Sequence, residues 1–358
     1  MRLAINLGYW GAGNGPDNLV LAQEADRLGY AVAWVAEAYG SDAPTILSWV
    51  GAQTSQIGLG SAVLQIPART PAMTAMTAAT LDSLSGGRFH LGLGVSGPQV
   101  SEGWHGVRFD RPLARTREYV DIVRMALRRE TVAYAGRHFT LPLPDGPGKA
   151  LKLTVRPARG GAIPIYLAAV GPKNLELTGE IADGWLAIFF SPEHSGELLD
   201  SLRTGAVRGG RGTIGDPLAG FDIVPTVPVV VTETEADRDY GYAAVSAYAA
   251  LYIGGMGSRE KNFYFDLAVR MGFEAAAREV QDLFLDLEPR RAAAAVPLEF
   301  IDATALLGPP QRIRDRLARY ADAGVTTLSV SPVAATLQER QGVLRMMTDL
   351  VAAAGLAE

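Results

Sequence analysis

Two side chains suited to proton transfer follow strand-like segments of this 358-residue chain. Glu37 ends the apolar run Ala31–Ala36, and His105 lies in a polar loop that follows the run Arg88–Leu93. In parallel α/β folds, the loops at the carboxyl ends of strands bind ligands and carry catalytic groups. We therefore expect Glu37 either to face a ligand or to cap the next helix, and His105 to be either a general acid or a surface residue.

A glycine-rich stretch, Gly92–Gly97, fits the G-x-G-x-x-G pattern of dinucleotide sites. That fingerprint opens directly into a helix and normally lies in the first strand–helix unit of a domain. Here Pro98 and a polar run follow the glycines, no helical periodicity returns before Leu113, and other strand–helix units come first. The context therefore disfavours a nicotinamide dinucleotide site.

Strand and helix signals alternate along the whole chain. Apolar runs predict eight strands, at Leu3–Leu7, Ala31–Ala36, Ile57–Leu64, Arg88–Leu93, Ile163–Ala168, Gly184–Phe189, Phe221–Val231 and Thr326–Val330. Amphipathic segments with Asp, Thr, Pro and Gly at their ends predict helices at Asn18–Leu28, Ala43–Gln53, Pro71–Gly86, Leu113–Arg128 and Gly171–Ala182, and from Pro310 onward.

Eight strands separated by helices is the count that a (β/α)₈ TIM barrel requires. We expect an α/β TIM barrel as a single domain over residues 1–358, with insertion segments at about 97–112, 131–160 and 232–302. In the last insertion, two or three helices should replace one at the mouth of the barrel. A doubly wound sheet is the alternative, but the sequence shows no clear boundary for a second domain.

Composition narrows the range of partners. A net charge of −5 gives no basic surface for nucleic acid, and the lack of long apolar runs or a signal peptide indicates a cytoplasmic protein without membrane spans. The chain has no cysteine, and its four histidines lack the paired spacing of metal ligands. We therefore expect a small-molecule substrate and no metal.

The motif LDSLSGGRFHLGLGVSGP, the segment 163–174 and the entry to the sixth strand at 181–185 together resemble the bacterial luciferase-like superfamily. The likeness runs from Met1 to about Leu350. The loop 97–106 is similar to that of the branch that uses the deazaflavin coenzyme F420, including actinobacterial oxidoreductases similar to methylenetetrahydromethanopterin reductase. The resemblance implies F420 as cofactor, with FMN as the alternative, and a homodimer or higher homo-oligomer.

The resemblance also implies positions for the cofactor. The ring would rest on a bulge after the third strand, often with a cis peptide, at Leu64, Gln65 and Ile66, and beside the loop Val95, Ser96 and Gly97. Glu37 matches the acidic position near the ring's polar edge. The cofactor phosphate would lie at Ala169, Val170, Gly171, Pro172 and Asn174, where the start of a helix offers N–H groups and a positive dipole end.

Three positions depart from better-known relatives. F420-dependent glucose-6-phosphate dehydrogenases carry a histidine and a glutamate where this chain has Ala38 and Gly97, and the methylenetetrahydromethanopterin reductases carry a glutamate where it has Asn6. We expect hydride transfer between the deazaflavin C5 and another small organic substrate. The alternatives are an FMNH₂-dependent monooxygenase and a non-catalytic F420-binding protein.

Overall fold

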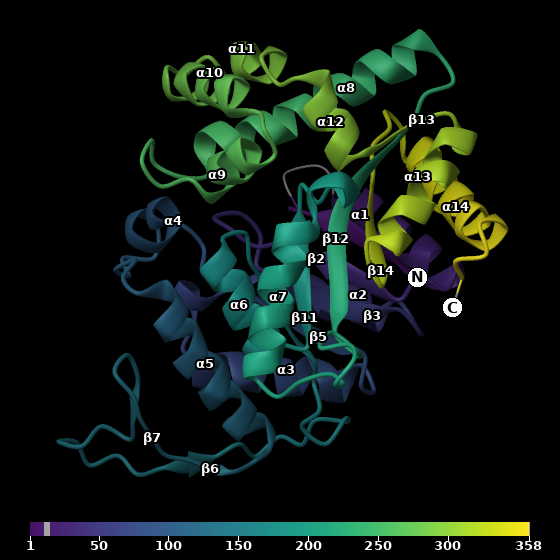
Figure 1. Ribbon diagram of the computed structural model, residues 1–358. Coiled ribbons are helices and arrows are strands. Elements are labelled where there is room, and N and C mark those ends of the chain that lie inside the picture. Colours follow the sequence, from purple (N-terminus) through teal and green to yellow (C-terminus); the bar gives the residue numbers. More distant parts are fainter. Residues whose placement is uncertain (11–14, 358) are drawn as a thin grey trace.

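The chain folds as a closed parallel barrel with helices around it, in a computed structural model that describes residues 1–10 and 15–357 (Figure 1). Its barrel strands are β1 (Arg2–Gly8), β2 (Val32–Val35), β3 (Gly58–Ser61) continued by β4 (Leu64–Gln65), β5 (Phe89–Gly94), β10 (Ile165–Ala168), β11 (Gly184–Ile188), β12 (Asp222–Val231) and β14 (Thr327–Pro332). The pairing of β5 with β10, and of β14 with β1, closes the ring. The predicted TIM barrel and its eight strands are thereby confirmed.

Helices connect successive strands on the outside of the ring. They are α1 (Gly15–Arg27), α2 (Ala43–Ala52), α3 (Pro71–Leu84), α5 (Pro112–Leu127), α6 (Pro172–Ile181), α7 (Gly196–Arg208), α13 (Pro310–Asp322) and α14 (Leu337–Ala353). Asp42 caps α2 and Thr70 caps α3, each accepting a hydrogen bond from a backbone N–H of the first turn. Short 3₁₀ turns lie at Ile66–Ala68 and Pro192–His194.

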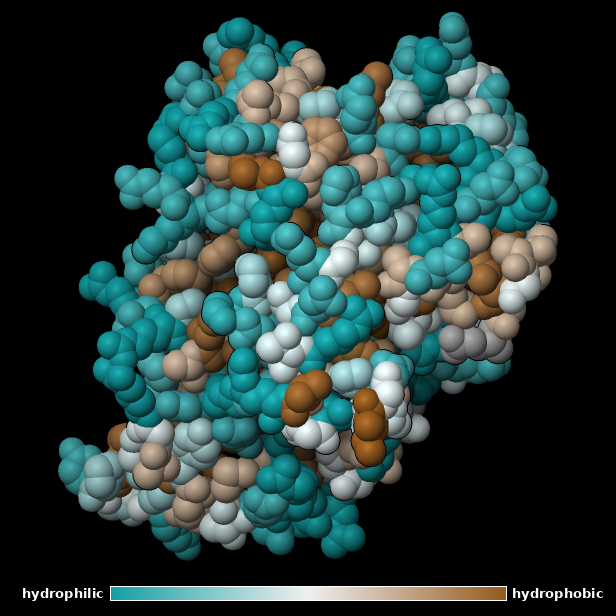
Figure 2. Space-filling view, in the orientation of Figure 1, coloured by the Kyte–Doolittle hydropathy of each residue, from teal (hydrophilic) through white to brown (hydrophobic). Residues whose placement is uncertain are grey.

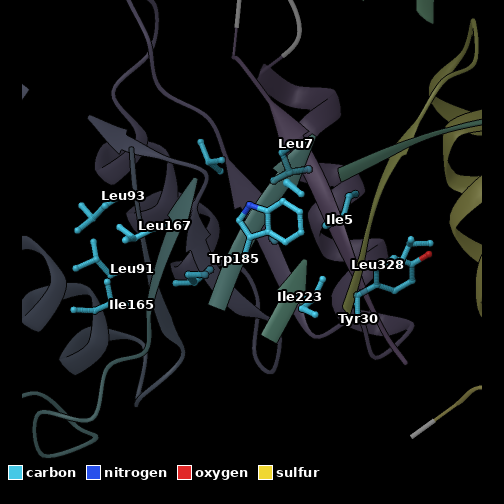
Figure 3. Close-up of a cluster of buried hydrophobic side chains, with 14 of the residues drawn as sticks. Ile5, Leu7, Tyr30, Leu91, Leu93, Ile165, Leu167, Trp185, Ile223 and Leu328 are labelled. Atoms are coloured by element: carbon cyan, nitrogen blue, oxygen red, sulfur yellow. The ribbon is translucent and has the colours of Figure 1, made fainter. Parts of the chain in front are cut away.

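The main core lies between the ring and these helices. Alternate strand residues point outward and pack against the apolar faces of the helices, because side chains of a strand alternate between its two faces. Figure 3 shows part of this cluster, including Ile5, Leu91, Leu93, Ile165, Leu167, Trp185, Ile223 and Leu328. All of these side chains are buried, so the helical layer and the ring form one continuous hydrophobic unit.

Large rings fill the interior of the barrel. Trp34 of β2 packs edge-on against Tyr166 of β10, with ring centroids 5.2 Å apart, although these strands are not neighbours. A Cβ on Gly60 would lie 2.2 Å from the Trp34 ring, so only glycine fits there. His90 contacts both rings, and burial lowers its pKa to about 3. The His90 imidazole is therefore neutral, and it packs with the two aromatic rings in the interior of the barrel.

The segment LDSLSGGR, residues 81–88, holds the end of the barrel opposite the cavity described below. The guanidinium of Arg88 donates to the carbonyls of Ser85, Ile57 and Gly51 at 3.0, 2.8 and 2.8 Å, and it also bonds Thr54. Because these acceptors belong to the ends of α2 and α3 and the start of β3, one planar cation joins three connections. The motif therefore has a structural role.

Three insertions extend this ring. Residues 97–112 include α4 (Pro98–Gly103), and residues 131–160 form two short antiparallel pairs, β6 (Thr131–Val132) with β9 (Leu151–Lys152) and β7 (Tyr134–Ala135) with β8 (Thr140–Leu141). The last contains α8 (Glu235–Ala250), a π-helical turn (Leu251–Gly255), α9 (Phe263–Arg270), α10 (Glu274–Leu285), α11 (Pro289–Ala294) and α12 (Leu298–Thr304), followed by β13 (Leu306–Gly308).

Two expectations about these insertions were wrong. The third insertion holds five α-helices, all within the described residues, rather than two or three, and Figure 1 shows them above the barrel. A short helix, α4, also follows Gly97 directly, where the sequence predicted none before Leu113. It has only six residues and follows the fourth barrel strand, so its position still differs from that of a dinucleotide-binding helix.

Replacing Arg88 should destabilise the fold. We expect Arg88→Ala to lower the free energy of unfolding by about 2–4 kcal/mol, because several backbone carbonyls lose a charged donor. Arg88→Lys should recover only part of this loss, since an ammonium lacks the planar fork of donors. Urea denaturation measures the free energy of unfolding of both variants. Equal stability of Arg88→Ala and the unchanged protein would contradict the structural role.

Candidate active site

One large cavity lies at the carboxyl ends of the barrel strands. Its volume is about 980 Å³, and its walls come from the segments that follow β1, β2, β4, β5 and β10 and from the insertion 232–302. Figure 2 shows hydrophobic residues in the recess between the helices at the top and the barrel. A concave site of this size at this rim is the usual place for a cofactor and substrate in a TIM barrel.

Part of the cavity wall is formed where the third barrel strand is interrupted. Ala62 and Val63 line the cavity between β3 and β4, and the peptide bond that joins them is cis. The sequence placed this feature at Leu64–Ile66, two residues too late. Leu64 and Ile66 are buried and are not among the lining residues, whereas Gln65 is.

Glu37 lines the cavity, and hydrogen bonds from two neighbouring residues fix its carboxylate. Both carboxylate oxygens accept from the Arg69 guanidinium, and Oε2 also accepts from the N–H of Ala43 in the first turn of α2, at 3.1 Å. The two expectations for Glu37 were stated as alternatives, but its carboxylate both lines the cavity and caps α2. Arg69 neither points to solvent nor stands free for an acidic ligand, because it also pairs with Asp42.

Gln65 joins two more segments at the same rim. Its Nε2 donates to the Ala38 carbonyl at 2.6 Å, and its Oε1 accepts from the Ser96 hydroxyl at 3.0 Å. Ser96 has a positive φ of 61°. With Val95 and Gly97, it lines the cavity. The segments after β2, β4 and β5 are thus fixed to one another by side chains that also face the cavity.

The segment between β10 and α6 lines another part of the cavity. Ala169, Val170, Gly171, Pro172 and Asn174 all line it, and Gly171 is the N-cap of α6 with no side chain to bond the first turn. The Oδ1 atom of Asn174 is buried and has no hydrogen-bond partner among the described residues. This end of the cavity offers a positive helix terminus and an unused side-chain acceptor.

Three cationic side chains line the cavity. Lys173 belongs to the first turn of α6, Arg270 donates to the carbonyl of Val170 at 3.1 Å, and Arg111 directly precedes α5. Neither Arg111 nor Arg270 was expected from the sequence, since isolated arginines in loops and insertions have no distinguishing pattern. Together with the α6 terminus, Lys173 and Arg270 favour an anionic group near α6.

Aromatic side chains form another wall of the cavity. Tyr9 comes from the end of β1, and the others come from the third insertion, namely Tyr248, Tyr252, Phe263 and Tyr264. Phe189 packs behind them, with its ring centroid 5.5 Å from Tyr248 and 5.7 Å from Tyr252. The aromatic residues of the third insertion therefore divide between its core and the wall of the cavity.

His105 is not brought to this cavity. It follows α4, its backbone N–H bonds the Val100 carbonyl at 3.1 Å, and its Nε2 atom is buried without a partner among the described residues. It is absent from the residues that line the cavity. Its expected role as a general acid therefore gains no support from its position.

Among residues 1–10 and 15–357, no group of three or more His, Asp or Glu side chains is placed so that it could hold a metal ion. In the same part of the chain, none of the helices combines the length and apolar character needed to cross a bilayer. The titratable groups that line the cavity are two carboxylates, Glu37 and Asp266, together with three cations and several phenols.

Comparison with known proteins agrees with this geometry. The sequence profile of a family described as "Luciferase-like monooxygenase" matches residues 9–327. A Mycobacterium tuberculosis protein named "Putative coenzyme F420-dependent oxidoreductase" is 46% identical over 337 residues, which cover 92% of this chain and 95% of that protein. The 5,10-methylenetetrahydromethanopterin reductase of Archaeoglobus fulgidus is 28% identical over 313 residues, 86% of this chain and 87% of that enzyme.

A solved structure shares the fold over the full length. The coenzyme F420-dependent tetrahydromethanopterin reductase of Methanopyrus kandleri superposes with a TM-score of 0.81 at 22% identity, covering 99% of each chain. The chain belongs to the luciferase-like monooxygenase family and is an oxidoreductase of that family. The resemblance read from the LDSLSGGR segment and its neighbours is therefore confirmed.

The Glu37–Arg69 pair should contribute strongly to the stability of the rim. Only 7% of the Glu37 side chain and 15% of the Arg69 side chain are exposed. We expect Arg69→Met to cost about 3 kcal/mol of unfolding free energy, because it leaves a buried carboxylate without its cation. Adding Glu37→Gln to that variant should restore part of the loss.

An exposed ion pair provides the matched control. Arg203 pairs with Asp200, with side-chain exposures of 48% and 74%. Arg203→Met should therefore cost less than about 1 kcal/mol. Chemical denaturation followed by circular dichroism compares the variants, and a similar small loss for Arg69→Met would show that the buried pair does not hold the rim.

Proposed function

We propose that this protein is a coenzyme F420-dependent oxidoreductase that transfers a hydride between the deazaflavin C5 and a small organic substrate. The observation that carries the proposal is one cavity whose lining combines the N-terminus of α6 and the cations Arg111, Lys173 and Arg270 with aromatic and apolar side chains. F420 has both a flat ring and an acidic tail. The name of the relative from Mycobacterium tuberculosis agrees with this choice.

The residues present fit such a cofactor. The N-terminus of α6 at Gly171 would hold the tail phosphate, and the unpartnered Asn174 Oδ1 would accept from a hydroxyl of the tail. Ala62 and Val63, with the Val95–Gly97 segment, would support the ring. When bound, F420 supplies the redox chemistry by giving or accepting a hydride at C5.

Glu37 would then accept a hydrogen bond from the polar edge of the ring. Its carboxylate already accepts from Arg69 and Ala43, which fixes its position, and a carboxylate has lone pairs left for another donor. Gln65 and Ser96 hold the neighbouring segments in place. The protein's contribution is therefore to fix the ring and to form a substrate compartment with few mobile polar groups.

Asn6 argues for a substrate other than a tetrahydropterin or a sugar phosphate. It lines the cavity, and its Oδ1 accepts from the N–H of Gly8 at 3.1 Å. An amide cannot donate a carboxyl proton, and Ala38 and Gly97 add no acid or base at the rim. We further propose a homodimer or higher homo-oligomer, which light scattering would test.

Paired binding measurements test the cofactor. We expect the purified protein to bind oxidised F420 at micromolar concentration and FMN more weakly, because FMN has no glutamate tail to contact the cationic end. Fluorescence titration of both compounds at equal protein concentration measures this. Tight FMN binding with O₂ consumption would favour the monooxygenase alternative, and F420 binding without turnover of any substrate would favour a binding protein.

A substitution at Gly171 tests the proposed tail site. No heavy atom lies within 4 Å of a Cβ built on Gly171, and its φ of −81° suits any residue. We expect Gly171→Asp to weaken F420 binding at least tenfold, because its carboxylate repels the phosphate. Asp and Asn are both good N-caps, so the fold should be kept in both variants.

Gly171→Asn is the matched control, since it has nearly the same shape without the charge. Its F420 affinity should stay within a few-fold of the unchanged protein. The two affinities are compared at low and at high salt, because screening should narrow the difference. Equal F420 affinity of the Asp and Asn variants at low salt would place the phosphate elsewhere.

A further inference from the structure

Two tyrosine hydroxyls connect the buried wall of the cavity with its opening. The Tyr9 and Tyr252 hydroxyl oxygens are 3.4 Å apart, and both residues line the cavity. Tyr252 is 8% exposed, whereas Tyr9 is 41% exposed. A proton on the buried phenol therefore has a short route to solvent through the exposed one.

The backbone that presents Tyr252 is unusual. It lies in the π-helical turn Leu251–Gly255, a conformation that is rare and frequent at functional sites. The buried amide of Asn262 donates to the carbonyls of Tyr252 and Ile253 at 3.0 and 2.7 Å. The same side chain accepts from the N–H groups of Tyr264 and Phe265, so one buried residue fixes the turn and the start of α9.

The proposed reduction needs a proton donor, and the cavity is lined by two carboxylates, Glu37 and Asp266, by cations and by phenols. Glu37 is a carboxylate bonded to a guanidinium, and Lys173 pairs with Glu176 at 2.8 Å. Burial raises the pKa values of Tyr248, Tyr252 and Tyr264 well above their usual range. These phenols are therefore neutral donors throughout the physiological pH range.

The side chains around Tyr252 favour an apolar substrate. Its ring packs against Tyr248 and Tyr264, with centroids 4.7 and 4.8 Å apart, and Leu251 and Met256 extend the apolar lining. Such a surface gains free energy by covering apolar groups and offers little to a polyol or an ionic substrate. A single acceptor oxygen on an otherwise apolar molecule matches a single phenol donor.

We propose that Tyr252 is the catalytic proton donor for reduction of an uncharged, apolar aldehyde or ketone, with Tyr9 returning the proton from solvent. The inference rests on the proposed function, which supplies reduced deazaflavin as the two-electron reductant. The carbonyl carbon gains the hydride, the C=O π pair moves to oxygen, and oxygen takes the Tyr252 proton. The phenolate is reprotonated through Tyr9, and the products are the alcohol and oxidised coenzyme.

The test uses acetophenone labelled with ¹³C at its carbonyl, bound to the protein loaded with oxidised F420. Isotope-edited infrared difference spectra report the hydrogen bond to the carbonyl without any turnover. We expect a lower C=O stretching frequency in the unchanged protein than in an apolar solvent, and loss of this shift in Tyr252→Phe. With reduced F420, kcat for acetophenone should fall by 10²–10⁴-fold in Tyr252→Phe, and by less in Tyr9→Phe.

Tyr240→Phe is the matched control, because Tyr240 lies on α8, is 48% exposed and does not line the cavity. It should keep both the frequency shift and kcat. If the unchanged protein fails to bind F420, the proposed function is overturned. If F420 binds but acetophenone shows no shift, or the shift and kcat survive in Tyr252→Phe, the role of Tyr252 is overturned while the cofactor assignment stands.

Discussion

The packing of two large rings inside a closed barrel is the constraint on which the rest of the molecule depends. Trp34 and Tyr166 meet across the ring, and Gly60 leaves the space that the Trp34 ring takes up. Because the interior is filled at this level, the large cavity lies beyond it, at the carboxyl ends of the strands. The position of the cavity is thus a result of which interior residues are large and which are glycine.

Above that layer, the rim is shaped by buried polar contacts between segments that are distant in sequence. Glu37 and Arg69 join the segments after β2 and β4, and Gln65 extends the connection to Ser96. Each of these contacts costs desolvation that is recovered only if the geometry is good. They therefore fix a single arrangement of the loops that line the cavity before any ligand arrives, which lowers the entropy cost of binding.

Local sequence signals predicted the ring well and the site only in part. Strand periodicity and caps such as Asp42 and Thr70 are local, so the barrel and the α6 terminus at Gly171 could be read directly. The cis bond at Ala62–Val63 has no such signal, because two small apolar residues do not distinguish it from a continuous strand. The tyrosine pair could not be found either, since Tyr9 and Tyr252 are 243 positions apart and meet only through the fold.

The hydrogen bond from Arg270 to the Val170 carbonyl joins the third insertion to the rim of the barrel. Arg270 ends α9, the helix that carries Tyr264, while Val170 belongs to the segment before α6. Both residues line the cavity, so the insertion and the ring share a hydrogen bond at its wall. A movement of α9 away from the rim would have to break this bond. The wall that comes from the third insertion is therefore not independent of the wall that comes from the barrel.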